Sequence, residues 1–74
     1  MKLKNRIKEL RFQHDQMTQQ ALADAVEVTR MTIYSIEKER FIPSTLLAFK
    51  IARVFGLSVE DIFSLEEIEE GEMK

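Results

Sequence analysis

Arg30 is the residue of this 74-residue chain best suited to recognise a partner by its chemistry. A guanidinium donates two parallel hydrogen bonds, and guanine offers two matching acceptors, O6 and N7, in the major groove of DNA. Met31 follows in the chain, and its flexible side chain can lie against a thymine methyl group. Ser35 comes one helical turn later, where a hydroxyl can reach a base or a phosphate. Presented together on one helix, these three side chains would contact base edges.

The stretch around these residues has the pattern of two short helices joined by a tight turn. The spacing of its apolar residues predicts helices over 19–26 and 30–38. Thr18 and Thr29 precede them, and each hydroxyl can accept a hydrogen bond from an otherwise unpaired backbone N–H. The small Ala23 lets two crossed helices approach closely. Such a helix-turn-helix can place its second helix in the DNA major groove.

Further residues around this unit are of the types that bind phosphate. Phosphate contacts position a protein on DNA and do not specify sequence. The start of a helix offers backbone N–H groups and positive potential to an anion, which favours Gln19 as such a contact. Tyr34 can reach a phosphate or pack on the flank of its helix, and both remain open. The predicted backbone contacts are Thr18, Gln19, Thr29, Tyr34, Lys38 and Arg40.

The rest of the chain predicts more helices. Periodicity and capping residues indicate helices over 4–13, 45–55 and 59–64, and β-branched alternation is absent. We therefore expect an all-α domain of five helices across residues 1–64, followed by an acidic C-terminal tail or helix extension over 65–74. The predicted core consists of Ile7, Leu10, Leu22, Ala23, Val26, Val28, Ile33, Ile36, Leu47, Ala48, Ile51, Ala52, Phe55, Val59 and Ile62.

These motifs resemble the DNA-binding domain of the phage-repressor family, which includes lambda-repressor-like and Cro-like proteins and is also called the XRE type. The resemblance covers residues 4–63, and it is close to short, single-domain members. It lies in the segments IKELR, TQQALADAV, TRMTIYSIEK, Pro43-Ser44 and LAFKIARVFGLSVEDIF. It implies a lambda-repressor-like fold of five helices, with Arg30, Met31 and Ser35 at the positions that read bases.

The chain departs from the family pattern at three places in its backbone. Glu27 and Glu39 stand where members usually have glycine, in the turn between the two helices and just after the second. If the backbone stays left-handed there, a residue other than glycine costs about 1–2 kcal/mol. Otherwise the turn differs and re-aims the recognition helix. The connection between Arg11 and Gln19 is also slightly longer than usual.

The resemblance further implies an ion pair and a dimer interface. Arg11 and Glu37 match a partly buried pair that members place between their first and third helices, and two unrelated surface charges are the alternative. Members generally dimerise through the last helix and the loop before it, and Leu46 on the preceding helix is unusually apolar. The corresponding interface residues here are Leu57, Val59, Phe63, Leu65 and Ile68. Alternatively, the last three of these close the domain's own core.

Charge is segregated along the chain, although the net charge is only −2. Residues 1–57 carry ten basic and six acidic side chains, a net charge of +4. Residues 58–74 carry one basic and seven acidic side chains, a net charge of −6. A basic body with an acidic tail is typical of nucleic-acid binding at one surface and a different role at the other.

The composition argues against several other classes of protein. The chain has no cysteine, and its single His14 has no second ligand at metal-binding spacing, so we expect no metal and no cofactor. No apolar run approaches the ~20 residues of a membrane span, which favours a cytoplasmic protein without membrane contact. A domain of this size has hardly room for a substrate cleft, so we expect no enzyme.

We therefore favour a sequence-specific, double-stranded DNA-binding transcriptional regulator. We expect a homodimer on a palindromic operator, because paired half-sites raise affinity and specificity. We expect a repressor, because the chain has no room for an activation or sensor domain. The alternative is an antitoxin-type protein-interaction module whose acidic tail folds on a basic partner. A further rival is a tail that competes with DNA for the basic face.

Overall fold

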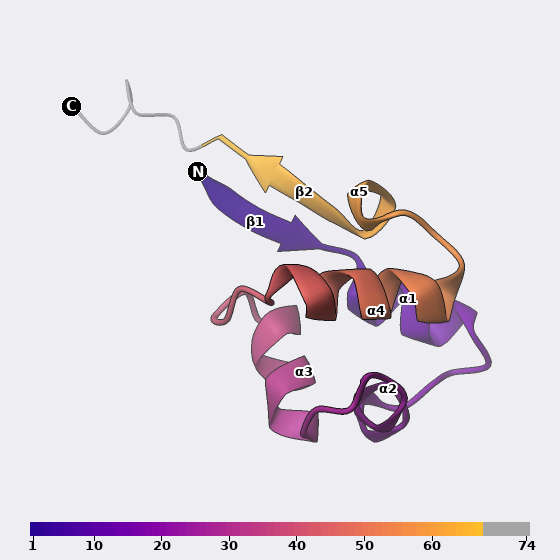
Figure 1. Cartoon of the computed structure of the whole chain (residues 1–74). Coiled ribbons are helices and arrows are strands. Elements are labelled where there is room, and N and C mark those ends of the chain that lie inside the picture. The colour runs from indigo at the N-terminus through magenta and orange to yellow at the C-terminus, as the bar shows by residue number, and fades with distance from the viewer. Residues whose placement is uncertain (68–74) are drawn as a thin grey trace.

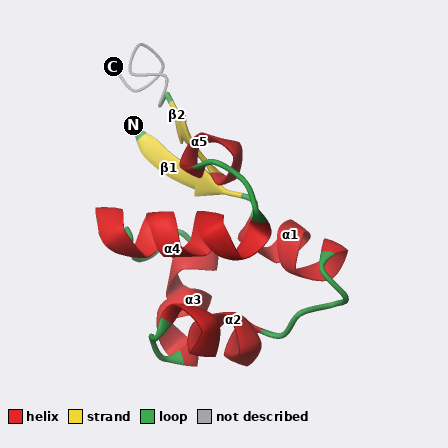
Figure 2. Ribbon diagram, turned by 45° about the vertical axis from the view of Figure 1, so that its right-hand side comes forward, coloured by secondary structure: helices red, strands yellow, loops and turns green. Residues whose placement is uncertain are grey.

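Within residues 1–67, which the computed structural model describes, the chain forms five helices and a two-stranded sheet (Figure 1). The helix-turn-helix lies at one end of the molecule and the sheet at the other, with α4 between them (Figures 1 and 2). The elements are β1 (Lys2–Asn5), α1 (Ile7–Gln13), α2 (Gln19–Val26), α3 (Arg30–Glu37), α4 (Thr45–Phe55), α5 (Val59–Ile62) and β2 (Phe63–Glu66).

Side-chain caps set the starts of the helices that carry the site. The Thr18 hydroxyl accepts a hydrogen bond from the Ala21 backbone N–H, and the Thr29 hydroxyl accepts one from that of Thr32. Each bond satisfies a backbone donor that has no partner within its helix. The predicted bounds of the second and fourth helices are confirmed, whereas α3 ends one residue early and α5 two residues early.

The all-α prediction misses the sheet at the two ends of the domain. β1 pairs antiparallel with β2, with Leu3 opposite Leu65 and Asn5 opposite Phe63. The predicted helix over 4–13 therefore begins only at Ile7, and the predicted helix extension at Leu65 is a strand. Pairing joins segments about 60 residues apart, so no short window of sequence shows it.

Strand β2 runs to Glu66, two residues past the predicted domain boundary at 64. Of the predicted acidic tail, residues 68–74 lie outside the described residues, and so does the predicted interface residue Ile68.

The core is almost the predicted one. Every predicted core residue is buried except three half-buried ones that pack against the core, Val28, Ala48 and Val59. Phe63 joins them from β2 with 7% of its surface exposed, although the sequence assigned it to a dimer interface. His14 is exposed at the end of α1, and its ring contacts that of Phe55 edge-on at 4.9 Å.

Candidate nucleic-acid interface

The outer face of α3 presents the predicted base-reading residues. Ile33 and Ile36 are buried and attach the helix to the core, which turns Arg30 and Met31 to the outside. Met31 is 54% exposed. Met31 and Ser35 line a shallow depression of about 300 Å³ together with Thr32, Arg40 and Phe41. The structure thus brings the predicted phosphate-binding Arg40 next to two of the predicted base-reading side chains.

Arg30 bends from the first turn of α3 toward the first turn of α2. Its Nη1 donates a hydrogen bond to Gln19 Oε1 over 3.4 Å, and its Nη2 lies 3.8 Å from the sulfur of Met31. Both contacts are at the surface of the protein. These contacts place the guanidinium beside the first turn of α2.

The predicted ion pair between Arg11 and Glu37 is present and buried. Arg11 Nε donates to one carboxylate oxygen of Glu37 over 2.7 Å, and Nη2 donates to the other over 3.1 Å. Its remaining terminal nitrogen, Nη1, donates to the Met17 carbonyl over 2.7 Å. The side chains are 8% and 7% exposed. Charges buried this deeply require such pairing, so the contact fixes α1 against α3.

Gln19 connects this buried pair to the surface. Its amide nitrogen donates to Glu37 Oε1 over 3.1 Å, while its amide oxygen accepts from Arg30. The sequence singled out Gln19 only as a phosphate contact. It gave no signal of this second contact, because the three residues come from different elements of the fold.

The other predicted backbone contacts lie around the same face. Thr18 and Thr29 are exposed caps, and a hydroxyl that accepts from the backbone still has a hydrogen to donate. Lys38 is exposed, and its ammonium lies 5.7 Å from the centre of the Tyr34 ring. Tyr34 is half-buried, which agrees with packing on the flank of α3.

Both glutamates at the usual glycine positions keep the left-handed backbone. Glu27 has φ 65° and Glu39 has φ 64°. The backbone N–H of Val28 donates to the Ala23 carbonyl, and that of Arg40 donates to the Ser35 carbonyl, as expected where a left-handed residue ends a helix. The turns therefore keep the left-handed backbone that glycine normally supplies.

Ion pairs hold the two glutamate side chains away from the outer face of α3. Glu27 contacts Lys50 over 2.8 Å, and Glu39 contacts Lys2 over 3.2 Å and Lys4 over 3.4 Å. The hydrogen bond from Lys50 lowers the pKa of Glu27, and the one from Lys2 is the largest cause that lowers the pKa of Glu39. Lys2 and Lys4 were missed because the sequence did not predict β1.

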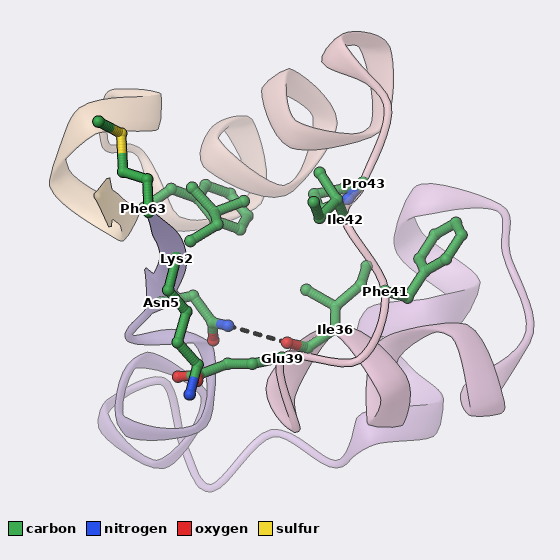
Figure 3. Close-up of a pocket in the computed structure, with 10 residues that line it drawn as sticks. Lys2, Asn5, Ile36, Glu39, Phe41, Ile42, Pro43 and Phe63 are labelled. Atoms are coloured by element: carbon green, nitrogen blue, oxygen red, sulfur yellow. Dashed lines mark hydrogen bonds and ion pairs between the residues drawn. The ribbon is translucent and has the colours of Figure 1, made fainter. Parts of the chain in front are cut away.

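Strand β1 also supports the C-terminal end of α3. The Asn5 side-chain amide donates to the Ile36 carbonyl over 2.9 Å (Figure 3). The Asn5 side-chain oxygen accepts from the backbone N–H of Ile7 at the start of α1. A cavity of about 160 Å³ lies beside this contact, and its lining includes Phe41, Ile42 and Phe63. Asn5 thus ties the end of α3 to the start of α1.

The residues predicted to form a dimer interface differ in their exposure. Leu57 and Leu65 are exposed, Val59 is half-buried, and Phe63 belongs to the domain's own core. Leu46 is 67% exposed, as its unusual apolar character suggested. The sequence missed Phe49, which is 62% exposed one helical turn after Leu46 and lines a groove with Leu57 and Val59. The i,i+3 spacing of Leu46 and Phe49 on α4 could have indicated that the two side chains share one face of the helix.

A helix-turn-helix with an exposed second helix is the defining unit of a large class of DNA-binding proteins. The helix-turn-helix family model matches residues 7–62 of this chain. YgzD of Bacillus subtilis, an uncharacterized HTH-type transcriptional regulator, is 46% identical over 65 residues, which are 88% of this chain and 97% of YgzD. An uncharacterized HTH-type transcriptional regulator of Methanocaldococcus jannaschii is 48% identical over 67 residues, 90% of this chain and all of the relative.

An uncharacterized HTH-type transcriptional regulator of Archaeoglobus fulgidus is 49% identical over 67 residues, which are 90% of this chain and 93% of the relative. The chain therefore belongs to the XRE-type helix-turn-helix family of DNA-binding transcriptional regulators. Proteins of this family are generally not enzymes. Among residues 1–67, no helix is long and apolar enough to span a membrane.

Proposed function

We propose that this regulator binds a specific palindromic operator as a homodimer, with α3 in the major groove. The observation that carries the proposal is the outer face of α3, where Arg30 and Met31 lie in the first turn and Ser35 lies in the second. Arg30 donates to O6 and N7 of a guanine, and Met31 packs on a thymine methyl. Ser35 lies one turn further along and hydrogen-bonds a base or a phosphate.

The backbone contacts surround this face and set the register of α3. The first turn of α2, from Gln19, offers backbone N–H groups to one phosphate. The hydroxyls of Thr18 and Thr29 and the cations of Lys38 and Arg40 flank the same groove. Tyr34 contributes to phosphate binding indirectly, because its ring lies under the ammonium of Lys38 and helps to place it. These contacts hold the protein on any DNA, and the three base-reading residues choose among sequences.

The proposed dimer uses the exposed apolar side chains of α4 and of the loop before α5. Leu46, Phe49 and Leu57 are exposed there, and Val59 lines a groove with Phe49 and Leu57. Covering these side chains removes apolar surface from water, which favours association. The exposed Leu65 on β2 also belongs to the proposed dimer interface, whereas the buried Phe63 does not. Two copies related by a two-fold axis would place their recognition helices on half-sites about one helical turn, ~34 Å, apart.

Repression is the regulatory outcome that this arrangement favours. A domain of this kind that covers a promoter excludes polymerase from the same DNA, without any further surface. The protein would act in the cytoplasm, where bacterial and archaeal chromosomal DNA is accessible to it.

Selection from a random pool of duplex DNA at physiological salt tests the proposal. We expect an enriched palindrome with half-sites about one turn apart. Retention without enrichment would mean that the protein binds only the DNA backbone, and no retention would contradict DNA binding by this surface. In the variant test, Arg30→Ala should relax the preference at one base pair per half-site, whereas Lys38→Ala should weaken binding to all sequences alike.

A second candidate function is contact with a basic protein through the acidic C-terminal segment. The supporting observation is Leu65, which is 66% exposed on β2 at the beginning of that segment. Deletion of residues 67–74 would separate the two functions. Loss of a protein partner with unchanged DNA binding would support the antitoxin-type module, whereas tighter DNA binding at low salt would support a tail that competes with DNA.

A further inference from the structure

Strand β1 brings two lysines to the carboxylate that follows α3. Glu39 lies 3.2 Å from the ammonium of Lys2 and 3.4 Å from that of Lys4, and its side chain is turned toward Lys2 (Figure 3). The Glu39 side chain is 19% exposed, whereas those of Lys2 and Lys4 are 52% and 43% exposed. The two lysines are two residues apart on one strand, so their side chains leave it on the same face. The strand therefore delivers both ammonium groups to one carboxylate.

Glu39 occupies a place where its charge matters for the DNA surface. It stands between Lys38 and Arg40, the two cations that we propose to bind phosphate. Within residues 1–67, neither of these cations forms an ion pair. An unpaired carboxylate between them would repel phosphate and would compete with it for both cations. The glycine that family members usually have at this place carries no such charge.

Lys4 balances a second carboxylate at the same place. Its ammonium lies 3.8 Å from the carboxylate of Glu66, which is 60% exposed on β2. In the sheet, Glu66 lies opposite Lys2. The two positive charges of β1 thus balance the two negative charges of Glu39 and Glu66, and the cluster of four side chains is neutral as a whole.

We infer that Lys2 and Lys4 are positioning residues for DNA binding, because they hold and neutralise Glu39 so that Lys38 and Arg40 keep their positive charge for phosphate. The β1 lysines act through Glu39 and need not contact DNA themselves. The inference rests on the proposed function, because it requires the C-terminal end of α3 to face the phosphates.

Direct contact of the β1 lysines with phosphate makes the opposite prediction. A lysine that is paired with Glu39 is less available to phosphate, so its loss would matter more once Glu39 is removed. A lysine that neutralises Glu39 matters more while Glu39 is present. The sign of the coupling between the lysines and Glu39 therefore distinguishes the two roles.

A double-mutant cycle measures this coupling. The pair of substitutions Lys2→Gln, Lys4→Gln is made in the natural protein and in Glu39→Gly. Lys8→Gln is the control in both backgrounds, because Lys8 is exposed on α1 and forms no ion pair with residues 1–67. Dissociation constants are measured at about 0.1 M salt for the selected operator and for a scrambled duplex of equal length. Circular dichroism verifies that each variant is folded at the assay temperature.

We expect Lys2→Gln, Lys4→Gln to weaken DNA binding about two- to fivefold more in the natural protein than in Glu39→Gly, as for the loss of exposed ion pairs. The loss should be equal on both duplexes, because phosphate contacts carry no sequence information. Lys8→Gln should have the same effect in both backgrounds. Lys2→Arg, Lys4→Arg keeps both charges and should bind like the natural protein.

An equal loss in the two backgrounds would overturn the inference, because net charge alone would then explain it. A larger loss in Glu39→Gly would also overturn it and make the β1 lysines phosphate contacts. So would an arginine variant that binds as weakly as the glutamine variant. If the natural protein retains no DNA, the proposed function fails and the inference fails with it. If it binds its operator and only the coupling is absent, the proposed function stands and the role of the β1 lysines alone is refuted.

Discussion

Breaking the buried ion pair from one side should come close to unfolding this domain. Arg11→Met removes the guanidinium and leaves the Glu37 carboxylate, 7% exposed, with the amide of Gln19 as its partner. The Met17 carbonyl also loses its donor. An unpaired buried charge of this kind costs about 3–5 kcal/mol. Small domains have a free energy of unfolding of about 5 kcal/mol or little more, so the variant should be only marginally folded.

Urea unfolding followed by far-UV circular dichroism measures this loss, and the double variant Arg11→Met, Glu37→Leu is its control. Replacing both partners by apolar residues of similar size removes the unpaired charge. The double variant should therefore recover most of the stability that the single variant loses. A single-variant loss below about 1 kcal/mol, as for an exposed pair, would refute the argument that burial makes this contact essential.

Four further predictions concern the turns, the pH dependence, the dimer and the DNA contacts. Gly56→Ala should lower the free energy of unfolding by about 1 kcal/mol, because Gly56 has the left-handed φ of +67° that alanine disfavours. An added Cβ would meet nothing within 4 Å, so the loss measured by thermal unfolding should come from the backbone conformation and not from a steric clash. Lys2 and Lys4 lower the folded-state pKa of Glu39 below its ordinary 4.5, so the unfolded chain binds more protons in acid. The resulting stabilisation is present above pH 4.5 and is lost as the pH falls below it. Urea unfolding at a series of pH values should therefore show that the free energy of unfolding falls less steeply in acid for Glu39→Gln than for the natural protein. Phe49→Asp should give a folded monomer in sedimentation equilibrium, whereas Phe63→Asp should unfold the domain, and a Phe49→Asp variant that stays dimeric would contradict the proposed interface. Lys38→Ala should reduce the slope of log affinity against log salt by about one, and an unchanged slope would show that Lys38 does not contact phosphate.

The helix-turn-helix could be predicted from the sequence because its signals are local. Thr18 and Thr29 cap the helices that follow them, and apolar residues recur at helical spacing within each short stretch. The outward positions of Arg30 and Met31 followed directly from the inward positions of the isoleucines on α3.

The sheet could not be predicted in the same way, because its two strands depend on each other. Leu3 matched a helix through its spacing from Ile7, and four residues of strand are too few to outweigh that pattern. Phe63 and Leu65 alternate as strand residues do, yet their partners lie at the other end of the chain. Local spacing fitted a helix equally well, and tertiary pairing decided the outcome.

The contacts within the site were predictable only in part. The resemblance to the family implied the pair of Arg11 with Glu37, which joins α1 to α3. The link from Glu37 through Gln19 to Arg30 depends on how three elements meet, and side-chain spacing along one helix does not contain that information.

Methylation interference on the selected operator tests the central claim most directly. A methyl group on guanine N7 blocks the acceptor that Arg30 is proposed to use in the major groove. We predict that methylation of one guanine in each half-site abolishes binding by the natural protein, at two symmetric positions about one turn apart, and that Arg30→Ala becomes insensitive to both. Interference at no guanine, or unchanged interference with Arg30→Ala, would contradict base reading by this residue of the recognition helix.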